Sequence, residues 1–315
     1  MENKIYDLII LGAGPAGVAG AIYAHRKNID TLLIGESFGG QATVAAKIAN
    51  IPGHLGISGM QMANAFENHI KNVGVAFAND KVDKIEKQGD IFQVKTINNN
   101  YQTKNILLAF GRKYKDLGIP NEEKYKGMGL FYCSTCDAAL FKDKVGVVVG
   151  AGNTALNSVI DLFPFAPKIY VITRGDAMRA DVILQEEGKK NPKVEIIYNS
   201  QITELEGEVM INAVKYKNLQ TNEEKRLETF GVFVNIGMKP NSELLEGLVE
   251  LNENKEIITD LLGRTSQKGI WAAGDVTSLP HKQISIAIGG GIRAVLDIYS
   301  EIRKSNYQET VADAI

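Results

Sequence analysis

Cys133 and Cys136 are the only cysteines in the chain, and with the following Asp137 they form a C-S-T-C-D motif. A local C-x-x-C pair in a chain of this size is typical of redox or metal chemistry, because structural disulfides are rare in the cytosol. A structural zinc ion takes four ligands, and the four histidines of the chain are scattered without ligand spacing. We therefore expect thiol–disulfide chemistry and no metal. Asp137 is a candidate proton shuttle or, alternatively, a helix N-cap.

Two glycine-rich loops lie on either side of this motif in the sequence. G-A-G-P-A-G spans residues 12–17, and G-A-G-N-T-A spans residues 150–155. Such glycines permit a tight turn and a close approach of the backbone to a pyrophosphate, which faces the N-terminus of the next helix. Glu36 stands slightly beyond the usual spacing for an acid that binds a ribose. Two loops indicate two dinucleotides.

The segments around each loop have the pattern of a strand, a helix and a second strand. Apolar runs precede both loops, as in buried parallel strands. The sequence predicts an α/β protein with two nested Rossmann-like, three-layer dinucleotide-binding domains, the second inserted into the first. The expected strands are residues 7–11, 30–34, 144–149 and 168–173, and the expected helices after the loops are residues 16–27 and 153–163.

A polar connector and a later G-M-K-P-N segment mark the points where the chain leaves and re-enters the first domain. We expect this domain to comprise residues 1–114 and 242–315. The inserted domain, residues 115–241, would carry the C-x-x-C pair. Further helices are expected at residues 42–49 and 283–302, with a polar tail at residues 304–315.

Composition excludes several functional classes. The chain is 44% hydrophobic and 23% charged, which is ordinary for a globular protein. A formal net charge of −2 gives no electrostatic reason to expect a nucleic acid partner. No window approaches the roughly 18 uninterrupted apolar residues of a membrane helix, and no apolar signal region follows the N-terminus. We expect a cytoplasmic protein that binds neither nucleic acid nor a membrane.

Taken in order, the motifs resemble those of the low-molecular-weight thioredoxin reductases of bacteria and archaea over essentially the whole chain. The set comprises G-A-G-P-A-G, G-G-Q, C-S-T-C-D, G-A-G-N-T-A, G-M-K-P-N and A-A-G-D-V. A C-x-x-C-D motif just ahead of the second loop separates this family from the glutathione reductases, whose redox cysteines lie near the first loop. The resemblance implies a homodimeric flavoenzyme that passes electrons from NADPH through FAD to thioredoxin. Cys136 would face the flavin, Cys133 would exchange with the protein substrate, and Asp137 would carry the proton.

The resemblance also implies which residues hold the cofactors. Asp275 would bond the ribityl or phosphate portion of FAD, and the helix after Gln283 would point its N-terminus at the flavin ring. Arg174 and Arg179 would hold the 2′-phosphate of NADPH. The implied FAD residues are Gly12, Gly14, Pro15, Ala16, Gly17, Glu36, Gly40, Gln41, Asn50, Val82, Ala109, Gly111, Asp275, Lys282, Gln283 and Ile284. The implied NADPH residues are Gly150, Gly152, Asn153, Thr154, Ala155, Arg174 and Arg179.

The donor site departs from the family pattern. Where the family usually has H-R-R-x-x-x-R, this chain has T-R-G-D-A-M-R, so Gly175 replaces the middle arginine. Two guanidinium groups still suit a phosphate, although they are alternatively two solvated surface arginines. Some clostridial members take electrons from ferredoxin. A ferredoxin-dependent enzyme with a vestigial NADPH site is therefore the main competing hypothesis.

Two further hypotheses stay open. A flavin-bound disulfide sensor without turnover would need FAD and the dithiol but no donor site, and the largely intact second loop argues against it. A glutaredoxin-like or peroxiredoxin partner would serve the same chemistry as thioredoxin, because nothing in the sequence locates the partner surface.

Overall fold

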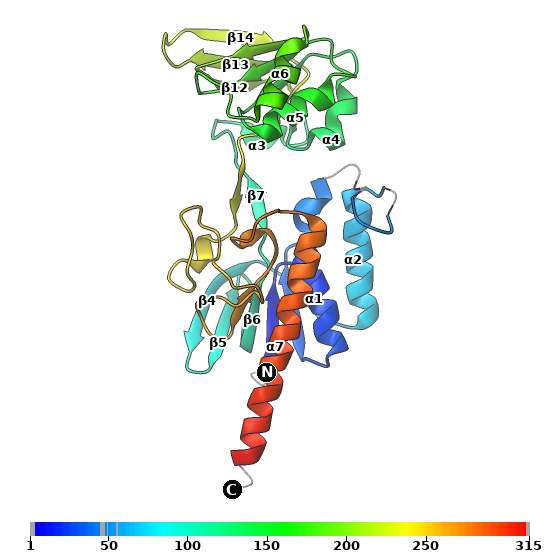
Figure 1. The fold of residues 1–315 in the computed structure, drawn as a ribbon, viewed down its shortest axis with the longest axis vertical. Helices are drawn as coiled ribbons and strands as arrows, with labels where there is room; N and C mark the ends of the chain where they lie inside the picture. The colour runs from blue at the N-terminus through cyan, green and yellow to red at the C-terminus, as the bar shows by residue number, and fades with distance from the viewer. Residues whose placement is uncertain (1–3, 45–47, 49, 55, 313–315) are drawn as a thin grey trace. The chain divides into compact units, whose positions relative to one another are not determined.

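The computed structural model describes residues 4–44, 48, 50–54 and 56–312 of the chain. It divides into two compact units (Figure 1). The first unit comprises Met1–Thr43, Ile48–Lys113 and Lys239–Ile315, and the second comprises Val44–Lys47 and Tyr114–Met238. Most of the second unit is thus a single insertion between two parts of the first.

A seven-stranded sheet forms the centre of the first unit. Its order is β3-β2-β1-β6-β5-β4, and the last strand in the sequence, β17, pairs with β6. The neighbours β3, β2, β1, β6 and β17 run parallel, whereas β4 and β5 form an antiparallel extension. The strands are β1 (Ile5–Leu11), β2 (Thr31–Gly35), β3 (Ala76–Asn79), β4 (Val82–Gln88), β5 (Ile91–Thr96), β6 (Asn100–Leu108) and β17 (Ile270–Ala272).

Three helices cover one face of this sheet (Figure 1): α1 (Pro15–Arg26), α2 (Gly59–Val73) and α7 (Ile284–Ala312). The helix α2 was not expected, although its start has a sequence signal. The Ser58 hydroxyl accepts a hydrogen bond from the Gln61 backbone, and the Gln61 side chain accepts one from the Ser58 backbone. This capping box satisfies backbone donors at the helix start.

The helix α7 is anchored to β17 by a buried polar group. The Asp297 carboxylate accepts a hydrogen bond from the Trp271 indole at 2.9 Å. It also accepts two bonds from the Arg264 guanidinium, at 2.6 and 2.7 Å. Such a bidentate arginine–carboxylate pair fixes the relative orientation of the two side chains as well as their distance. These bonds hold α7 against the strand that precedes the Asp275 turn.

Two expectations about helices are corrected. Where the structure describes the segment expected as a helix at residues 42–49, residues 42–44 lie in a 3₁₀ turn, η1 (Gly40–Val44), and Ile48 pairs with Ile57 in an isolated bridge. Residues 45–47 and 49 lie outside the described part of the chain. The loop signals at residues 50–53 turn the backbone back on itself, so bonding between Ile48 and Ile57 replaces helical bonding.

The last helix is longer than expected, since α7 continues to Ala312 and includes most of the polar tail. The segment from residue 292 to residue 312 contains neither glycine nor proline. Polar residues such as Glu, Lys and Arg are good helix formers, and Lys304 pairs with Glu301 at 2.8 Å, one turn apart. Polarity alone therefore did not end the helix.

A five-stranded parallel sheet of order β11-β10-β9-β15-β8 forms the centre of the second unit. Helices cover one face, and a three-stranded antiparallel sheet covers the other (Figure 1). The parallel strands are β8 (Leu130–Phe131), β9 (Gly146–Val149), β10 (Ile169–Ile172), β11 (Val194–Ile197) and β15 (Gly231–Val234). The helices are α4 (Ser134–Asp137), α5 (Asn153–Leu162) and α6 (Val182–Lys190), and the antiparallel strands are β12 (Ser200–Glu206), β13 (Ala213–Asn218) and β14 (Glu224–Glu228).

In both units the glycine loop joins a buried parallel strand to a helix, β1 to α1 and β9 to α5. The expected α/β fold with two Rossmann-like units, one inserted into the other, is confirmed. The two connecting segments, β7 (Arg112–Tyr114) and β16 (Met238–Pro240), pair with each other. No helix within the described residues is long and apolar enough to cross a membrane.

Candidate functional site

In the first glycine loop, two of the glycines have no room for a side chain, whereas a third has room for one. A Cβ atom on Gly12 would lie 2.3 Å from the Ala109 carbonyl oxygen, and one on Gly17 would lie 1.8 Å from the Gly12 carbonyl oxygen. A Cβ on Gly14 would meet nothing nearer than the Gly40 Cα at 3.9 Å. Gly12 and Gly17 are therefore required by the fold, whereas the space around Gly14 is open.

The helix after this loop is suited to an anion. Pro15 occupies the first helical position of α1, and the N-cap residue Gly14 has no side chain to bond the first amide groups. Those amides therefore have no capping side chain, and the helix dipole favours a phosphate there. Gly40 is close to Gly14, and the Asn50 amide donates a hydrogen bond to the Gln283 side chain at 3.2 Å.

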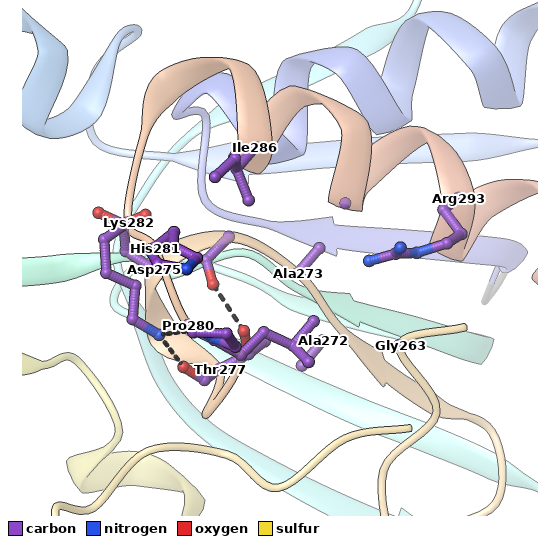
Figure 2. A pocket seen from close by; sticks show the side chains of 13 residues that line it. Gly263, Ala272, Ala273, Asp275, Thr277, Pro280, His281, Lys282, Ile286 and Arg293 are labelled. Carbon is purple, nitrogen blue, oxygen red and sulfur yellow. Dashed lines mark hydrogen bonds between the residues drawn. The ribbon is translucent and has the colours of Figure 1, made fainter. Parts of the chain in front are cut away.

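A small pocket of the first unit includes two more of the expected FAD residues, Asp275 and Lys282 (Figure 2). Asp275 lies in a 3₁₀ turn, η4 (Gly274–Val276), and not at the strand end itself. Burial raises its pKa, and no other described residue forms a hydrogen bond with its carboxylate. Its oxygens are therefore available to ligand hydroxyl groups.

Lys282 is held beside this acid by the backbone. Its ammonium group donates to the Thr277 carbonyl and, at 2.6 Å, to the Leu279 carbonyl (Figure 2). It also lies 3.5 Å from Glu256, which pairs with Arg112 at 3.3 Å. Burial lowers the pKa of Lys282. The Lys282 ammonium group thus supplies a positive charge at a fixed position. It lacks the planar geometry of the guanidinium group of an arginine.

The remaining expected FAD residues are less uniform. The Val82 side chain packs in the hydrophobic core with Ile85, and Ala109 is also buried. Glu36 and Gln41 are exposed. Ala16 is buried in α1, Ile284 is half-buried at the start of α7, and Gly111 has a left-handed φ of 65° with open space around it.

The second glycine loop, like the first, has one glycine without room for a side chain and one with open space around it. A Cβ atom on Gly150 would lie 2.4 Å from the Asn235 carbonyl oxygen, and its φ is 145°. A Cβ on Gly152 would meet nothing within 4 Å. Gly152 is the N-cap of α5 and forms no side-chain cap, while Ala155 is fully buried behind the loop. The loop retains the form that a pyrophosphate needs.

The segment with the two expected clamp arginines is tied to this loop. The Arg179 backbone donates to the Ala151 carbonyl at 2.7 Å. Asn153 and Asp181 exchange two hydrogen bonds, at 2.8 and 2.9 Å. The side chains of Arg174 and Arg179 are exposed, as is Thr154. The structure therefore brings Arg179 beside the second loop and leaves both guanidinium groups accessible.

Sequence reasoning missed Asn235, which follows the apolar strand β15. Its side-chain Oδ1 is buried and accepts no hydrogen bond from any residue that the structure describes. Its backbone oxygen adjoins Gly150, and its backbone amide donates to the Val149 carbonyl at 2.8 Å. Ligands of open parallel sheets bind at the point where the strand order reverses, which here lies between β9 and β15. An asparagine directly after a four-residue apolar strand was the available signal.

The redox motif consists of the short helix α4 and its N-cap residue, Cys133. Cys133 is disulfide-bonded and half-buried, and Cys136 is the only other cysteine in the sequence. The side chain of Cys136 is outside the described part of the structure. Burial raises the pKa of Asp137 to about 6. Asp137 is the N-cap residue of the 3₁₀ turn η2 (Ala138–Phe141), but its side chain forms no capping hydrogen bond there. The N-cap interpretation is therefore confirmed for its position and not for its side chain.

No group of three His, Cys, Asp or Glu side chains suited to a metal ion occurs among the residues that the structure describes. The second unit contains a disulfide, a carboxyl whose pKa burial raises to about 6, and the glycine loop before α5. The first unit contains the other glycine loop, before α1.

Comparison with known proteins assigns the chain to a family. Residues 6–291 match the pyridine nucleotide-disulphide oxidoreductase family. Thioredoxin reductase from Bacillus subtilis is 36% identical over 312 residues, covering 98% of each chain. The chain belongs to the low-molecular-weight thioredoxin reductase family. The crystal structure of Lactococcus lactis thioredoxin reductase is also similar, with 34% identity, 95% and 99% coverage of the two chains, and a TM-score of 0.77.

Two more similarities bear on the donor and the partner. An alkyl hydroperoxide reductase subunit, that of Pseudomonas aeruginosa, is 36% identical over 96% of this chain, which spans 60% of that protein's length. A ferredoxin-flavin thioredoxin reductase from Clostridium acetobutylicum is 30% identical, with a TM-score of 0.52 and coverage of 95% and 98% of the two chains.

Proposed function

We propose that this chain is a thioredoxin-disulfide reductase that takes electrons from NADPH through FAD to the Cys133–Cys136 pair. The observation that carries the proposal is the C-S-T-C-D motif itself. Cys133 is disulfide-bonded there, and burial raises the pKa of Asp137, the last residue of the motif, to about 6. The second glycine loop lies in the same unit. A homodimer, as expected for the family, is part of the proposal.

The first unit is the proposed FAD domain. The open position at Gly14 and the start of α1, which has no capping side chain, fit a phosphate. The Asp275 carboxylate accepts no hydrogen bond from a described residue and fits a polyol chain. Lys282 would hold a positive charge near the cofactor. When bound, FAD would supply two-electron transfer between a hydride donor and a disulfide.

The second unit is the proposed NADPH domain. Gly152 and the start of α5 would bind the pyrophosphate, since both are open on the ligand side. Arg174 and Arg179 would bind the 2′-phosphate, because guanidinium groups match its geometry and charge.

The thiols and Asp137 would carry out the exchange with the substrate. The Cys133 thiolate would attack the thioredoxin disulfide, form a mixed disulfide and release one thiolate. Attack by the Cys136 thiolate would then release the second and restore the Cys133–Cys136 disulfide. Asp137 would transfer protons to or from the thiols, for which a pKa of about 6 is well placed.

The test is an anaerobic titration of the purified flavoprotein, following the visible flavin absorbance. NADPH, NADH and reduced ferredoxin would be added separately. Fast bleaching by NADPH followed by reduction of thioredoxin supports the proposal. If none of the donors bleaches the flavin, turnover is contradicted and a disulfide sensor takes its place.

A ferredoxin donor is the second candidate. The observation in its favour is Gly175, which leaves a gap between two exposed arginines where the family has a third basic group. A solved ferredoxin-flavin thioredoxin reductase is 30% identical to this chain. Bleaching by ferredoxin alone would select this candidate and make the second loop a relic.

The electron acceptor has a second candidate as well. Relatives named as alkyl hydroperoxide reductase subunits are as similar to this chain as the thioredoxin reductases are. A thioredoxin-like or peroxiredoxin partner would accept electrons from the same dithiol. Parallel assays with thioredoxin and with a peroxiredoxin, at equal acceptor concentration, discriminate the two by kcat/KM.

A further inference from the structure

Ser134, the residue after Cys133, is buried and tied to α5 within the second unit. Its hydroxyl donates a hydrogen bond to the Asp161 carboxylate at 2.7 Å. The Ser158 hydroxyl donates to the Ser134 oxygen at 2.9 Å. Ser134 is 8% exposed and Ser158 is 1% exposed. Ser134, inside the redox motif, is thus held by one hydroxyl group, that of Ser158, and by the Asp161 carboxylate.

The hydrogen bonds from Ser158 to Ser134 and from Ser134 to Asp161 form a chain that ends at the Asp161 carboxylate. A serine hydroxyl has one proton to donate, and a carboxylate only accepts. Ser158 uses its proton on Ser134, and Ser134 uses its own on Asp161. A hydroxyl–carboxylate bond of this length is charge-assisted and stronger than a bond between neutral groups. The arrangement therefore keeps a carboxylate beside the segment between the cysteines.

A carboxylate bonded to the residue after Cys133 would act on the redox equilibrium of the cysteine pair. A neighbouring negative charge disfavours a thiolate, and a dithiol that forms thiolate less readily is a stronger reductant. Asp137 is a second acid, and it lies within the motif itself. A strongly reducing cysteine pair suits the proposed function, because the pair has to reduce the disulfide of a protein substrate.

We propose that Asp161, acting through Ser134, is a positioning residue that holds the redox segment against α5 and makes the reduced cysteine pair a stronger reductant. This inference rests on the proposed function, in which the pair passes electrons to a protein disulfide. It assigns a role to Ser134 and Asp161, which belong neither to the glycine loops nor to the cysteines and the acid of the C-x-x-C-D motif.

The test is a redox equilibrium with glutathione, measured on the full flavoprotein. The cysteine disulfide and two glutathione molecules give two protein thiols and one glutathione disulfide, so two electrons and two protons enter the pair as its S–S bond breaks. The equilibrium constant is read from the fraction of Cys133 and Cys136 that reacts with an alkylating reagent. This readout needs neither NADPH nor thioredoxin.

Asp161→Asn keeps an acceptor oxygen for Ser134 but removes the charge. We expect it to shift the equilibrium about tenfold toward the dithiol, which corresponds to about 30 mV for a two-electron couple. Ser134→Ala should shift it in the same direction by about threefold, because the carboxylate is then no longer held in place, and Ser134→Thr should restore the wild-type value. The double variant should shift no further than Asp161→Asn alone, since residues that act through one another are not additive.

Ser200→Ala is the matched control. Ser200 is 1% exposed in the same unit and donates to the Tyr198 carbonyl at 2.9 Å. An Asp161→Asn equilibrium constant within twofold of wild type overturns the inference, as does an equal shift in Ser200→Ala. If the wild-type pair did not exchange with glutathione at all, both the inference and the proposed function would be contradicted. If it exchanges normally and the variants do not differ, only the inference fails.

Discussion

Gly12 and Ala109 are so close that a Cβ atom on Gly12 would lie 2.3 Å from the Ala109 carbonyl oxygen. This contact joins the glycine loop after β1 to the end of β6. Gly14, two residues later, has no such neighbour within 3.9 Å. The same motif therefore contains a glycine required by packing and a glycine whose surroundings are open, and these two demands can be separated by experiment.

Gly12→Ala should damage the fold, whereas Gly14→Ala should damage only cofactor binding. At Gly12 the added methyl group meets backbone atoms and the φ of 111° is strained for alanine, so we expect a loss of several kcal/mol in the free energy of unfolding. At Gly14 the methyl group enters open space. Thermal unfolding of the apoprotein and FAD content per chain measure the two effects. Equal melting temperatures for both variants without FAD would contradict this division.

Cys133→Ser should abolish electron transfer to the protein substrate while leaving the flavin reducible. Serine cannot form the mixed disulfide, but the change does not touch the proposed FAD or donor residues. Flavin bleaching by the donor and thioredoxin reduction should be measured in the same preparation. Thioredoxin reduction at the wild-type rate would show that Cys133 is not the exchanging thiol.

Asp137 should make reduction of the Cys133 disulfide depend on pH near 6. Burial raises the pKa of this acid to about 6, so it is protonated below that pH and can donate to a departing thiolate. Reduction takes up protons, and its rate should therefore fall as pH rises through about 6. In Asp137→Asn this inflection should disappear. An unchanged profile in the variant would assign the titration to another group.

The same carboxyl should affect stability in a defined direction. Its pKa in the folded chain lies above the ordinary value of 3.8, so the folded state holds the proton more tightly between pH 4 and pH 6. Stability from this group is present below that window and is lost as pH rises through about 6. Denaturant unfolding of wild type and Asp137→Asn at pH 4.5 and pH 7.5 tests this. The variant should lose less stability between the two values.

Arg174→Ala combined with Arg179→Ala should raise the KM for NADPH far more than the KM for NADH. Only NADPH has the 2′-phosphate that two exposed guanidinium groups can bind. Steady-state kinetics with both donors measures the ratio. Lys189→Ala, an exposed charge on α6, is the control for a general loss of positive charge. Equal effects on the two donors would remove the case for a phosphate clamp.

Asn235→Ala should leave the fold at least as stable as wild type and weaken pyridine nucleotide binding. The buried Oδ1 has no hydrogen-bond partner among the described residues, and an unpaired buried polar atom is itself unfavourable. If this oxygen accepts a bond from the donor cofactor, its removal should raise the Kd about tenfold. Calorimetry with NADP⁺ and thermal unfolding provide the two measurements. A destabilised variant with unchanged affinity would make Asn235 structural.

Local sequence accounted for the parts of the molecule whose chemistry is contained in short segments. The strand–loop–helix units around Gly12 and Gly150 were expected within a few residues, because buried parallel strands and glycine turns have strong local patterns. The redox motif was evident from two cysteines and an acid in five residues. The helix expected at residues 42–49 failed because Ile48 pairs with Ile57, a contact that periodicity does not report.

Tertiary structure alone decided which of those residues are open, buried or paired. Ser134 and Asp161 are 27 residues apart in the chain, and they meet because α4 and α5 pack together. That Asn235 lies beside Gly150 of the second glycine loop, with a buried side-chain oxygen, is evident only from the structure. The sequence by itself determined the family, the fold and the redox pair, since these depend on ordered local motifs. The surroundings that tune the pair depend on which distant side chains share a buried space, and only the folded chain brings them together.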